Sequence, residues 1–196
     1  MIIGITGGTG CGKSTVCEVL ASYGYTVIDC DQIYHRLLTR DKKLLDAIRH
    51  RFPDAVTDGK LDRKRLGQTV FSDPQALADL NRITHSAVCA EVRRLLAQKP
   101  ENAVIDAVAL CESGLDSLCD LTVAVSAPES LRIRRLTQRD GISEEYARLR
   151  IGAQALPEVF ESRCDRTLYN DAPNGDLFRE KCVAFFSGLG IMKEEL

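Results

Sequence analysis

The residues near the amino terminus have types and spacing suited to holding a chain of phosphates. The segment Gly7-Gly8-Thr9-Gly10-Cys11-Gly12-Lys13-Ser14 matches the Walker A pattern G-x-x-x-x-G-K-[ST]. Because glycine has no Cβ atom, the backbone can wrap so that successive N–H groups point at phosphate oxygens, and the positive end of the next helix adds to the attraction. We therefore expect the residues from Gly7 to Thr15 to bind a nucleoside triphosphate.

Two side chains of this segment have chemical roles of their own. Lys13 is expected to reach the β- and γ-phosphates, and the hydroxyl of Ser14 is expected to complete the coordination shell of Mg²⁺. The alternative is a flexible glycine-rich turn without a ligand. The context favours a phosphate loop, because the apolar run 2–6 predicts a strand before it and the pattern 13–22 predicts a helix after it.

The composition is that of an ordinary globular protein. The chain has 196 residues, enough for one domain with an inserted subdomain, and 44% of them are hydrophobic and 28% charged. It has no run of the roughly 18 apolar residues that a membrane span needs, and residues 1–3 lack the basic region of a secretory signal. A formal charge of −2 argues against nucleic acid as a partner. We expect a cytoplasmic protein, with a monomer favoured.

The cysteines predict neither a zinc site nor a disulfide framework, because no two of them form a C-x-x-C pair. Free thiols in a reducing compartment are expected, most of them as small buried side chains. Cys11 differs in lying beside a positive helix end, which predicts a lowered thiol pKa and a reactive side chain. The eight cysteines are at positions 11, 17, 30, 89, 111, 119, 164 and 182.

Short apolar runs alternate with longer helical patterns, which predicts a parallel sheet covered by helices. The predicted strands are 2–6, 25–28, 103–106, 121–125 and 165–169. Between the second and third strands, residues 32 to about 99 form a helical pattern that suggests a substrate-binding insertion. Breaks in this pattern are expected at Phe52-Pro53, Asp58-Gly59 and Ser72-Asp73-Pro74. Later helices are expected to begin near residues 128, 143 and 176.

A pair of carboxylates follows the second predicted strand. Asp29-Cys30-Asp31 stands at its carboxyl end, where ligands bind in open α/β sheets. Asp31 is a candidate to orient an acceptor hydroxyl and take up its proton, and Asp29 is expected to point to the opposite face. The alternative for each is capping of the helix that begins near Gln32. Since neither D-x-x-G nor N-K-x-D occurs in the chain, these features indicate a small-molecule kinase rather than a GTPase.

Motifs spread along the chain match one known family. They are the phosphate loop with Thr6, Val27-Ile28-Asp29-Cys30-Asp31, Asp58-Gly59-Lys60-Leu61-Asp62-Arg63, Val70-Phe71-Ser72-Asp73-Pro74, Ile83-Thr84-His85, Glu112-Ser113-Gly114-Leu115-Asp116, Arg139-Asp140-Gly141 and Arg150-Ile151 with Ala153-Gln154. Their order and spacing closely resemble the dephospho-CoA kinase family over nearly the full length. The resemblance implies a single P-loop kinase domain of three α/β/α layers, with a five-stranded parallel sheet in the order 2-3-1-4-5. It also implies an inserted helical CoA subdomain at about 32–100 and a helical lid at about 139–164.

The resemblance further implies a reaction and roles for particular residues. The family transfers the γ-phosphoryl group of ATP, with Mg²⁺, to the 3′-hydroxyl of dephospho-CoA. Asp31, the second Asp of the family's D-x-D, would be the catalytic base. Arg139, just before a plausible hinge at Asp140-Gly141, would belong to the lid that closes over the triphosphate and stabilises charge during transfer. The side chains expected instead on solvated helix faces are Arg132, Arg134 and Arg148.

Four residues are candidates for substrate or metal contacts, most of them with a structural alternative. Thr6 is either a core-facing strand end or a substrate contact through its hydroxyl. His85, in the helical insertion, is either a structural histidine or a neighbour of the dephospho-CoA site. Glu112, in the loop after the third strand, is expected to position the substrate. Asp106 either holds Mg²⁺ through water or caps the end of its strand.

The chain departs from the family's usual pattern at several positions. Val108-Ala109-Leu110-Cys111-Glu112 stands where the family has P-L-L-F-E, Ser86 stands after His85 in place of proline, and Phe160 stands where a basic residue is common. These changes affect the expected contacts of the lid more than the reaction. Two rival functions stay open. One is a P-loop kinase that acts on a nucleoside or a sugar-like alcohol, and the other is a nucleotide-binding regulator.

Overall fold

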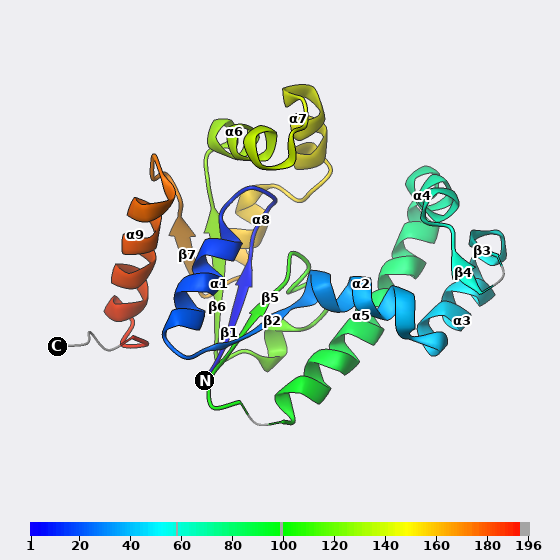
Figure 1. The fold of residues 1–196 in the computed structure, drawn as a ribbon, viewed down its shortest axis with the longest axis horizontal. Coiled ribbons are helices and arrows are strands. Elements are labelled where there is room, and N and C mark those ends of the chain that lie inside the picture. Colours follow the sequence, from blue (N-terminus) through cyan, green and yellow to red (C-terminus); the bar gives the residue numbers. More distant parts are fainter. Residues whose placement is uncertain (58, 99, 193–196) are drawn as a thin grey trace. The chain divides into compact units, whose positions relative to one another are not determined.

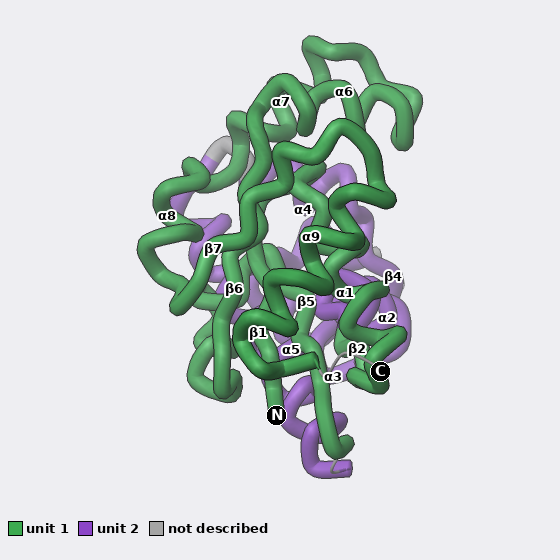
Figure 2. The backbone as a smooth tube through the Cα atoms, turned by 90° about the vertical axis from the view of Figure 1, so that its left-hand side faces the viewer, with its two compact units in different colours: residues 1–28, 100–196 green, residues 29–99 purple. Residues whose placement is uncertain are grey.

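The computed structural model describes residues 1–57, 59–98 and 100–192 of the chain. The chain divides into two compact units, which are described one at a time (Figure 2). Unit 1 comprises residues 1–28 and those from 100 onward, and unit 2 comprises residues 29–99. Within the described residues, no helix is long and apolar enough to cross a membrane.

A five-stranded sheet forms the centre of the fold (Figure 1). The strands are β1 (Ile2–Thr6), β2 (Thr26–Asp29), β5 (Ala103–Asp106), β6 (Leu121–Ser126) and β7 (Arg166–Tyr169). β1 pairs in parallel with β5 and with β6, and β6 pairs in parallel with β7. The order β2-β5-β1-β6-β7 confirms the predicted order 2-3-1-4-5, counted over these five strands along the chain.

Buried side chains of the sheet pack against two helices of unit 1. Ile3 and Ile5 of β1 are fully buried on the same face, because alternate side chains of a strand point the same way. They share a core with α1 (Lys13–Ser22) and α9 (Gly175–Gly188). Phe178 of α9, which is 1% exposed, belongs to the same core. This packing fixes the end of β1 and the start of α1, the two elements that flank the phosphate loop.

Three further helices lie between β6 and β7 in the chain. α6 (Glu129–Asp140) and α7 (Glu144–Gly152) pack around a small apolar cluster of their own, which includes the buried Leu136. The hydroxyl of Ser143 accepts a hydrogen bond from the backbone of α7, so Ser143 caps this helix as predicted. The sequence does not predict α8 (Pro157–Ser162), because six residues are too few to show a helical period.

Unit 2 is mainly helical, as predicted, and has its own apolar core around residues such as Ile48. Its helices are α2 (Cys30–Arg40), α3 (Lys42–Arg51), α4 (Arg63–Ser72) and α5 (Pro74–Leu96). The predicted break before α5 is confirmed. The Asp73 carboxylate accepts a hydrogen bond from the backbone of α5, and Pro74 occupies the first turn, where its missing N–H costs nothing.

The break predicted at Phe52-Pro53 is also confirmed, since a short 3-10 turn, Pro53–Ala55, follows α3. The chain then forms a hairpin that the sequence does not predict, made of β3 (Val56–Thr57) and β4 (Lys60–Leu61). Its strands of two residues are too short for an alternating pattern to be visible. Asp58 of the predicted Asp58-Gly59 break lies outside the described residues, as does Lys99 at the end of the predicted insertion.

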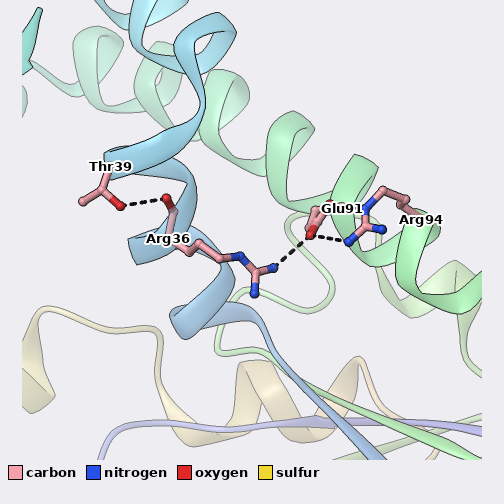
Figure 3. A network of polar contacts seen from close by, with 4 residues as sticks. All are labelled: Arg36, Thr39, Glu91 and Arg94. Atoms are coloured by element: carbon pink, nitrogen blue, oxygen red, sulfur yellow. Dashed lines mark hydrogen bonds and ion pairs between the residues drawn. The ribbon is translucent and has the colours of Figure 1, made fainter.

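An ion-pair network joins α2 to α5 within unit 2 (Figure 3). The guanidinium of Arg36 on α2 donates to Glu91 on α5 at 2.9 Å, and Arg94 donates to the same carboxylate at 2.7 Å. Arg94 and Arg36 together hold the pKa of Glu91 below its usual range. Thr39 adds a local bond from its hydroxyl to the carbonyl of Arg36. This network ties α2, the helix that carries Asp31, to the longest helix of the unit.

Candidate functional site

Side chains bind the carbonyl oxygens of the phosphate loop, which lies between β1 and α1. Four of its carbonyl oxygens accept hydrogen bonds in this way, three of them from residues of α6 and β7's carboxyl end. In a trans peptide the C=O and the following N–H point in opposite directions, so the N–H groups of Gly10 and Gly12 face away from these side chains. The pairs are Lys13 Nζ to Gly7 O at 3.0 Å, Arg132 Nε to Thr9 O at 2.9 Å, Arg135 Nη1 to Gly10 O at 3.4 Å and Asn170 Nδ2 to Cys11 O at 2.8 Å.

The last glycine of the loop is required by its surroundings. Gly12 has φ of 105°, in the left-handed region, and it is the residue from which α1 begins. A Cβ atom placed on it would lie 2.4 Å from Nδ2 of Asn170. Any other residue at this position would therefore push Asn170 away from the carbonyl of Cys11 and open the loop.

The prediction that Arg132 lies on a solvated helix face is wrong. The structure buries Arg132, with 5% exposure, against the phosphate loop, and burial lowers the pKa of its guanidinium. Arg135, one turn further along α6, contacts the loop too, whereas Arg134 is exposed. The sequence could not show this difference, because arginine occurs on both the buried and the solvated face of α6. With arginines at 132, 134, 135 and 139, residue type does not alternate between the two faces.

Asn170, to which the sequence analysis assigns no role, holds the phosphate loop in place. Its side chain is 2% exposed, donates to Cys11 O and accepts from Nη2 of Arg135 at 2.9 Å. Its own N–H donates to Ser126 O at 2.7 Å, which extends the pairing of β6 and β7 by one residue. One sequence signal could have indicated this role: Asn170 is a polar residue directly after an apolar strand of a parallel sheet, where ligand-binding residues lie.

We expect Asn170→Leu to lower the free energy of unfolding by about 1–3 kcal/mol, because it leaves the buried carbonyl of Cys11 without a partner. Urea unfolding followed by circular dichroism measures this change. Asn81→Leu, at an exposed position of α5, is the control and should change the free energy by no more than about 0.5 kcal/mol. Equal stability of the Asn170 variant and the wild type would contradict the assigned role.

Cys11 contradicts the prediction of a reactive thiol. Its side chain is 1% exposed, and this burial raises the thiol pKa despite the nearby charge of Lys13. The positive helix end is thus outweighed by the loss of hydration of the thiolate. The expected burial holds for Cys11, Cys17, Cys30 and Cys182, while the other four cysteines are half-buried. None of the eight forms a disulfide in this structure.

We therefore expect Cys11 to react with iodoacetamide at pH 8 far more slowly in the folded chain than in urea. The raised pKa keeps the thiol protonated at that pH, and the thiolate is the nucleophile. Cys119 and Cys164, whose pKa values burial raises to about 12, should behave in the same way. Mass spectrometry of timed samples measures each site. Equal labelling rates of Cys11 in the folded and unfolded chain would refute the expectation.

The start of the phosphate loop is tied to the loop that follows β5. The hydroxyl of Thr6, which is 1% exposed, donates to the carbonyl of Val108 at 2.9 Å. Further along the β5 loop, Glu112 is exposed and pairs with Arg163 at 2.5 Å. The hydroxyl of Thr6 thus has a structural role, as one of the two alternatives predicts. A contact of Thr6 or Glu112 with the substrate stays a prediction.

Two oxygen-bearing side chains of unit 1 bear on the predicted Mg²⁺ site. Ser14 is exposed in the first turn of α1, and its hydroxyl makes no hydrogen bond among the described residues. Asp106 is the last residue of β5 and pairs in register with Ile5 of β1, directly before the loop. Its charge reaches the loop, since it contributes to the raised pKa of Cys11.

Arg139, which the sequence predicts to belong to a lid, lies at the exposed end of α6, and within the described residues it makes no hydrogen bond to the phosphate loop. Its guanidinium donates twice to Asp140, at 2.6 Å and 3.1 Å, and Arg150 of α7 donates to the same carboxylate at 2.6 Å. These two guanidinium groups hold the pKa of Asp140 at about 2. Phe160 of α8, the position where a basic residue was expected, is buried instead and lines a small cavity beside Gly8.

Asp31 and His85 belong to unit 2. The Asp29 carboxylate accepts from the backbone and side-chain nitrogens of Gln32, each at 2.9 Å, so Asp29 caps α2. Asp31 lies exposed in the first turn of α2, and no hydrogen bond or ion pair of its carboxylate occurs within the described part of the chain. His85 is half-buried on α5. The capping alternative therefore holds for Asp29 and leaves Asp31 available.

Comparison with known proteins bears directly on the family that these features indicate. The family model described as dephospho-CoA kinase, CoaE, matches residues 1–176, a range that includes every candidate residue named above. The chain belongs to the dephospho-CoA kinase family. It is 39% identical to the dephospho-CoA kinase of Streptomyces avermitilis over 181 residues, which cover 90% of this chain and 88% of that protein.

Solved structures agree with this family and with the fold. The crystal structure of TT1252 from Thermus thermophilus superposes with a TM-score of 0.79 at 34% identity, covering 98% of both chains. The dephospho-CoA kinase from Campylobacter jejuni superposes with a TM-score of 0.58 at 26% identity, covering 96% of both chains. The chain is thus a member of a kinase family, as the sequence predicts.

Proposed function

We propose that this chain transfers the γ-phosphoryl group of ATP to the 3′-hydroxyl of dephospho-CoA, giving CoA and ADP. The observation that carries the proposal is the phosphate loop of a family member, with carbonyls bound by side chains and N–H groups turned the other way. The N–H groups of such a loop bind the oxygens of a triphosphate and favour an anionic ligand over an uncharged one. We place the reaction in the cytoplasm, where free thiols persist.

Within this proposal the loop and Lys13 stabilise the transferring group. Phosphoryl transfer passes through a loose transition state in which negative charge spreads over the oxygens, so fixed donors contribute most of the catalysis. Lys13 now donates to the carbonyl of Gly7, and its ammonium has the reach to exchange that partner for a phosphate oxygen. The N–H groups of Gly10 and Gly12 donate without having to reorganise.

The acceptor hydroxyl is assigned to Asp31. Its carboxylate is exposed and has no hydrogen bond or ion pair among the described residues, whereas that of Asp29 is occupied in capping α2. Asp31 orients the hydroxyl by accepting its hydrogen bond and takes up the proton as the new P–O bond forms. Thr6, His85 and Glu112 are the residues we propose to hold the rest of dephospho-CoA.

The residues present fit a Mg²⁺ ion held largely by the nucleotide. Mg²⁺ prefers oxygen ligands, keeps several waters and is bound in kinases through phosphates and one or two protein groups. The unbonded hydroxyl of Ser14 and the carboxylate of Asp106 are of that kind. Bound there, the ion would neutralise charge on the β- and γ-phosphates. The described residues contain no cluster of three or more His, Cys, Asp or Glu that would hold a metal by themselves.

Arg139 is the proposed lid residue of the reaction. Closure of the segment at about 139–164 would bring a guanidinium to the triphosphate and exclude water, which limits hydrolysis of ATP. To act there, Arg139 must leave Asp140, which then keeps Arg150 as a partner. Gly141, in the left-handed conformation at the end of α6, is the position at which the backbone turns.

An acceptor panel in an ADP-release assay tests the proposed function. Dephospho-CoA should stimulate ADP formation from MgATP, while adenosine, shikimate and gluconate should not. Stimulation by a nucleoside or a sugar-like alcohol alone would favour the other small-molecule kinases. Tight ATP binding without stimulation by any acceptor would favour a nucleotide-binding regulator. Either result would refute the proposal.

A further inference from the structure

One residue of the phosphate loop is held on both of its backbone polar groups by side chains. The carbonyl of Thr9 accepts from Nε of Arg132 at 2.9 Å, and the N–H of Thr9 donates to Oε1 of Gln154 at 2.7 Å. Nη2 of Arg132 also donates to Oε1 of Gln154 at 3.4 Å. Three hydrogen bonds thus close a ring of Thr9, Arg132 and Gln154, which we call the Thr9 clamp.

The loop is shaped to accept this clamp closely. A Cβ atom on Gly8 would lie 2.4 Å from Nη2 of Arg132 and 3.2 Å from Oε1 of Gln154, so only glycine lets the guanidinium lie against the loop. The backbone of Arg132 also lies near Gly10, where a Cβ atom would lie 3.1 Å from the carbonyl oxygen of Arg132. Gly8 and Gly10, which stand at variable positions of the Walker A pattern, therefore allow the close contact with α6.

Among the described residues the guanidinium of Arg132 donates to neutral oxygens, and the Glu129 carboxylate acts on its charge from beyond ion-pair distance. No carboxylate lies within ion-pair distance of this guanidinium in the part of the chain that the structure describes, although the side chain is buried. A buried cation that is hydrogen-bonded to neutral groups and has no close carboxylate is costly, and a polyanion bound in the adjacent loop would offset that cost. The exposed arginines of the same segment differ, since Arg139, Arg148 and Arg150 each pair with a carboxylate.

We propose that Arg132 and Gln154 are positioning residues for ATP, which fix Thr9 and thereby preform the phosphate loop. This inference rests on the proposed function for the reaction, but it concerns only the nucleotide. Gln154 follows α7 and Arg132 lies on α6, so the clamp also joins the helices that carry Arg139 and Arg150 to the loop. Neither residue needs to contact the transferring group.

Affinity for MgATP, measured by calorimetry without any acceptor, tests the clamp. Arg132→Gln should weaken binding by about tenfold or more, since it removes a charge-assisted bond and the buried charge. Gln154→Leu should weaken binding less, because it removes an acceptor and no charge. The double variant should bind no more weakly than Arg132→Gln, since both changes break the same ring. In steady state, KM for ATP should rise more than kcat falls.

Arg134→Gln is the matched control, because Arg134 is two residues from Arg132 on α6 but is exposed, and its guanidinium donates to the carbonyl of Pro173 rather than to the loop. It should bind MgATP within about twofold of the wild type. Wild-type affinity of a folded Arg132→Gln or Gln154→Leu variant would overturn the proposal, as would a lowered melting temperature with unchanged affinity. If Arg132→Gln does not fold, Gln154→Leu decides the matter. Because no acceptor is present, failure of dephospho-CoA as a substrate leaves this result intact.

Discussion

Replacement of Asp31 by asparagine is expected to lower kcat by about 10²- to 10⁴-fold, with MgATP affinity unchanged. Asparagine keeps the size of the side chain and can still accept a hydrogen bond, but it cannot take up a proton. The side chain is exposed in the first turn of α2 and makes no bond in the described residues, so the fold should tolerate the change. Steady-state ADP release with dephospho-CoA measures the loss.

Asp29→Asn provides the control for this prediction. The same chemical change two residues earlier falls on the cap of α2, where asparagine is as good a cap as aspartate. It should therefore preserve both stability and kcat. If Asp31→Asn kept most of the wild-type rate, or Asp29→Asn lost as much, Asp31 would not be the base.

Lys13→Met is expected to lower kcat/KM for ATP by about 10²-fold or more. Methionine has a similar length but no charge, so it removes the only ammonium within the Walker segment and leaves the packing of the loop intact. Lys13 also donates to the carbonyl of Gly7, and that neutral bond should cost little when lost, because water replaces it at a half-buried site. The loss should therefore appear in kinetics and not in the melting temperature.

Lys181→Met is the matched control, since this lysine of α9 pairs with Asp171 at the surface, where an ion pair is worth at most about 1 kcal/mol. Its kcat/KM should equal that of the wild type. A Lys13→Met variant with unimpaired turnover would show that the loop does not hold the transferring phosphate through this residue.

Much of the fold was predictable because its signals are local and strong. Apolar runs such as 103–106 have no alternation, which indicates buried parallel strands, and the Asp73-Pro74 pair marks a helix start without any tertiary information. The hairpin of β3 and β4 and the six-residue α8 were not predictable, because neither is long enough to show a period. The order of the strands came from the family resemblance and not from the residues.

The parts of the site that a sequence motif defines were predictable. The roles of residues that depend on burial of the side chain were not. The Walker A pattern identifies the residues of the phosphate loop directly. The sequence does not show that Arg132 is buried against this loop while Arg134 is exposed. The prediction of a reactive Cys11 was wrong for the same reason. The sequence shows the positive helix end beside this thiol, but it does not show the burial that raises the thiol pKa. Asn170 reaches Cys11 from 159 positions away, a separation that no local pattern records.

The phosphorus spectrum of the product tests the proposed phosphoryl transfer most directly. With MgATP and dephospho-CoA, ³¹P NMR should show one new phosphomonoester signal, and its coupling to the ribose proton should place it on the 3′-oxygen. ADP should appear in equal amount. A product without a phosphomonoester, or with the new phosphate elsewhere on the molecule, would contradict the proposed function.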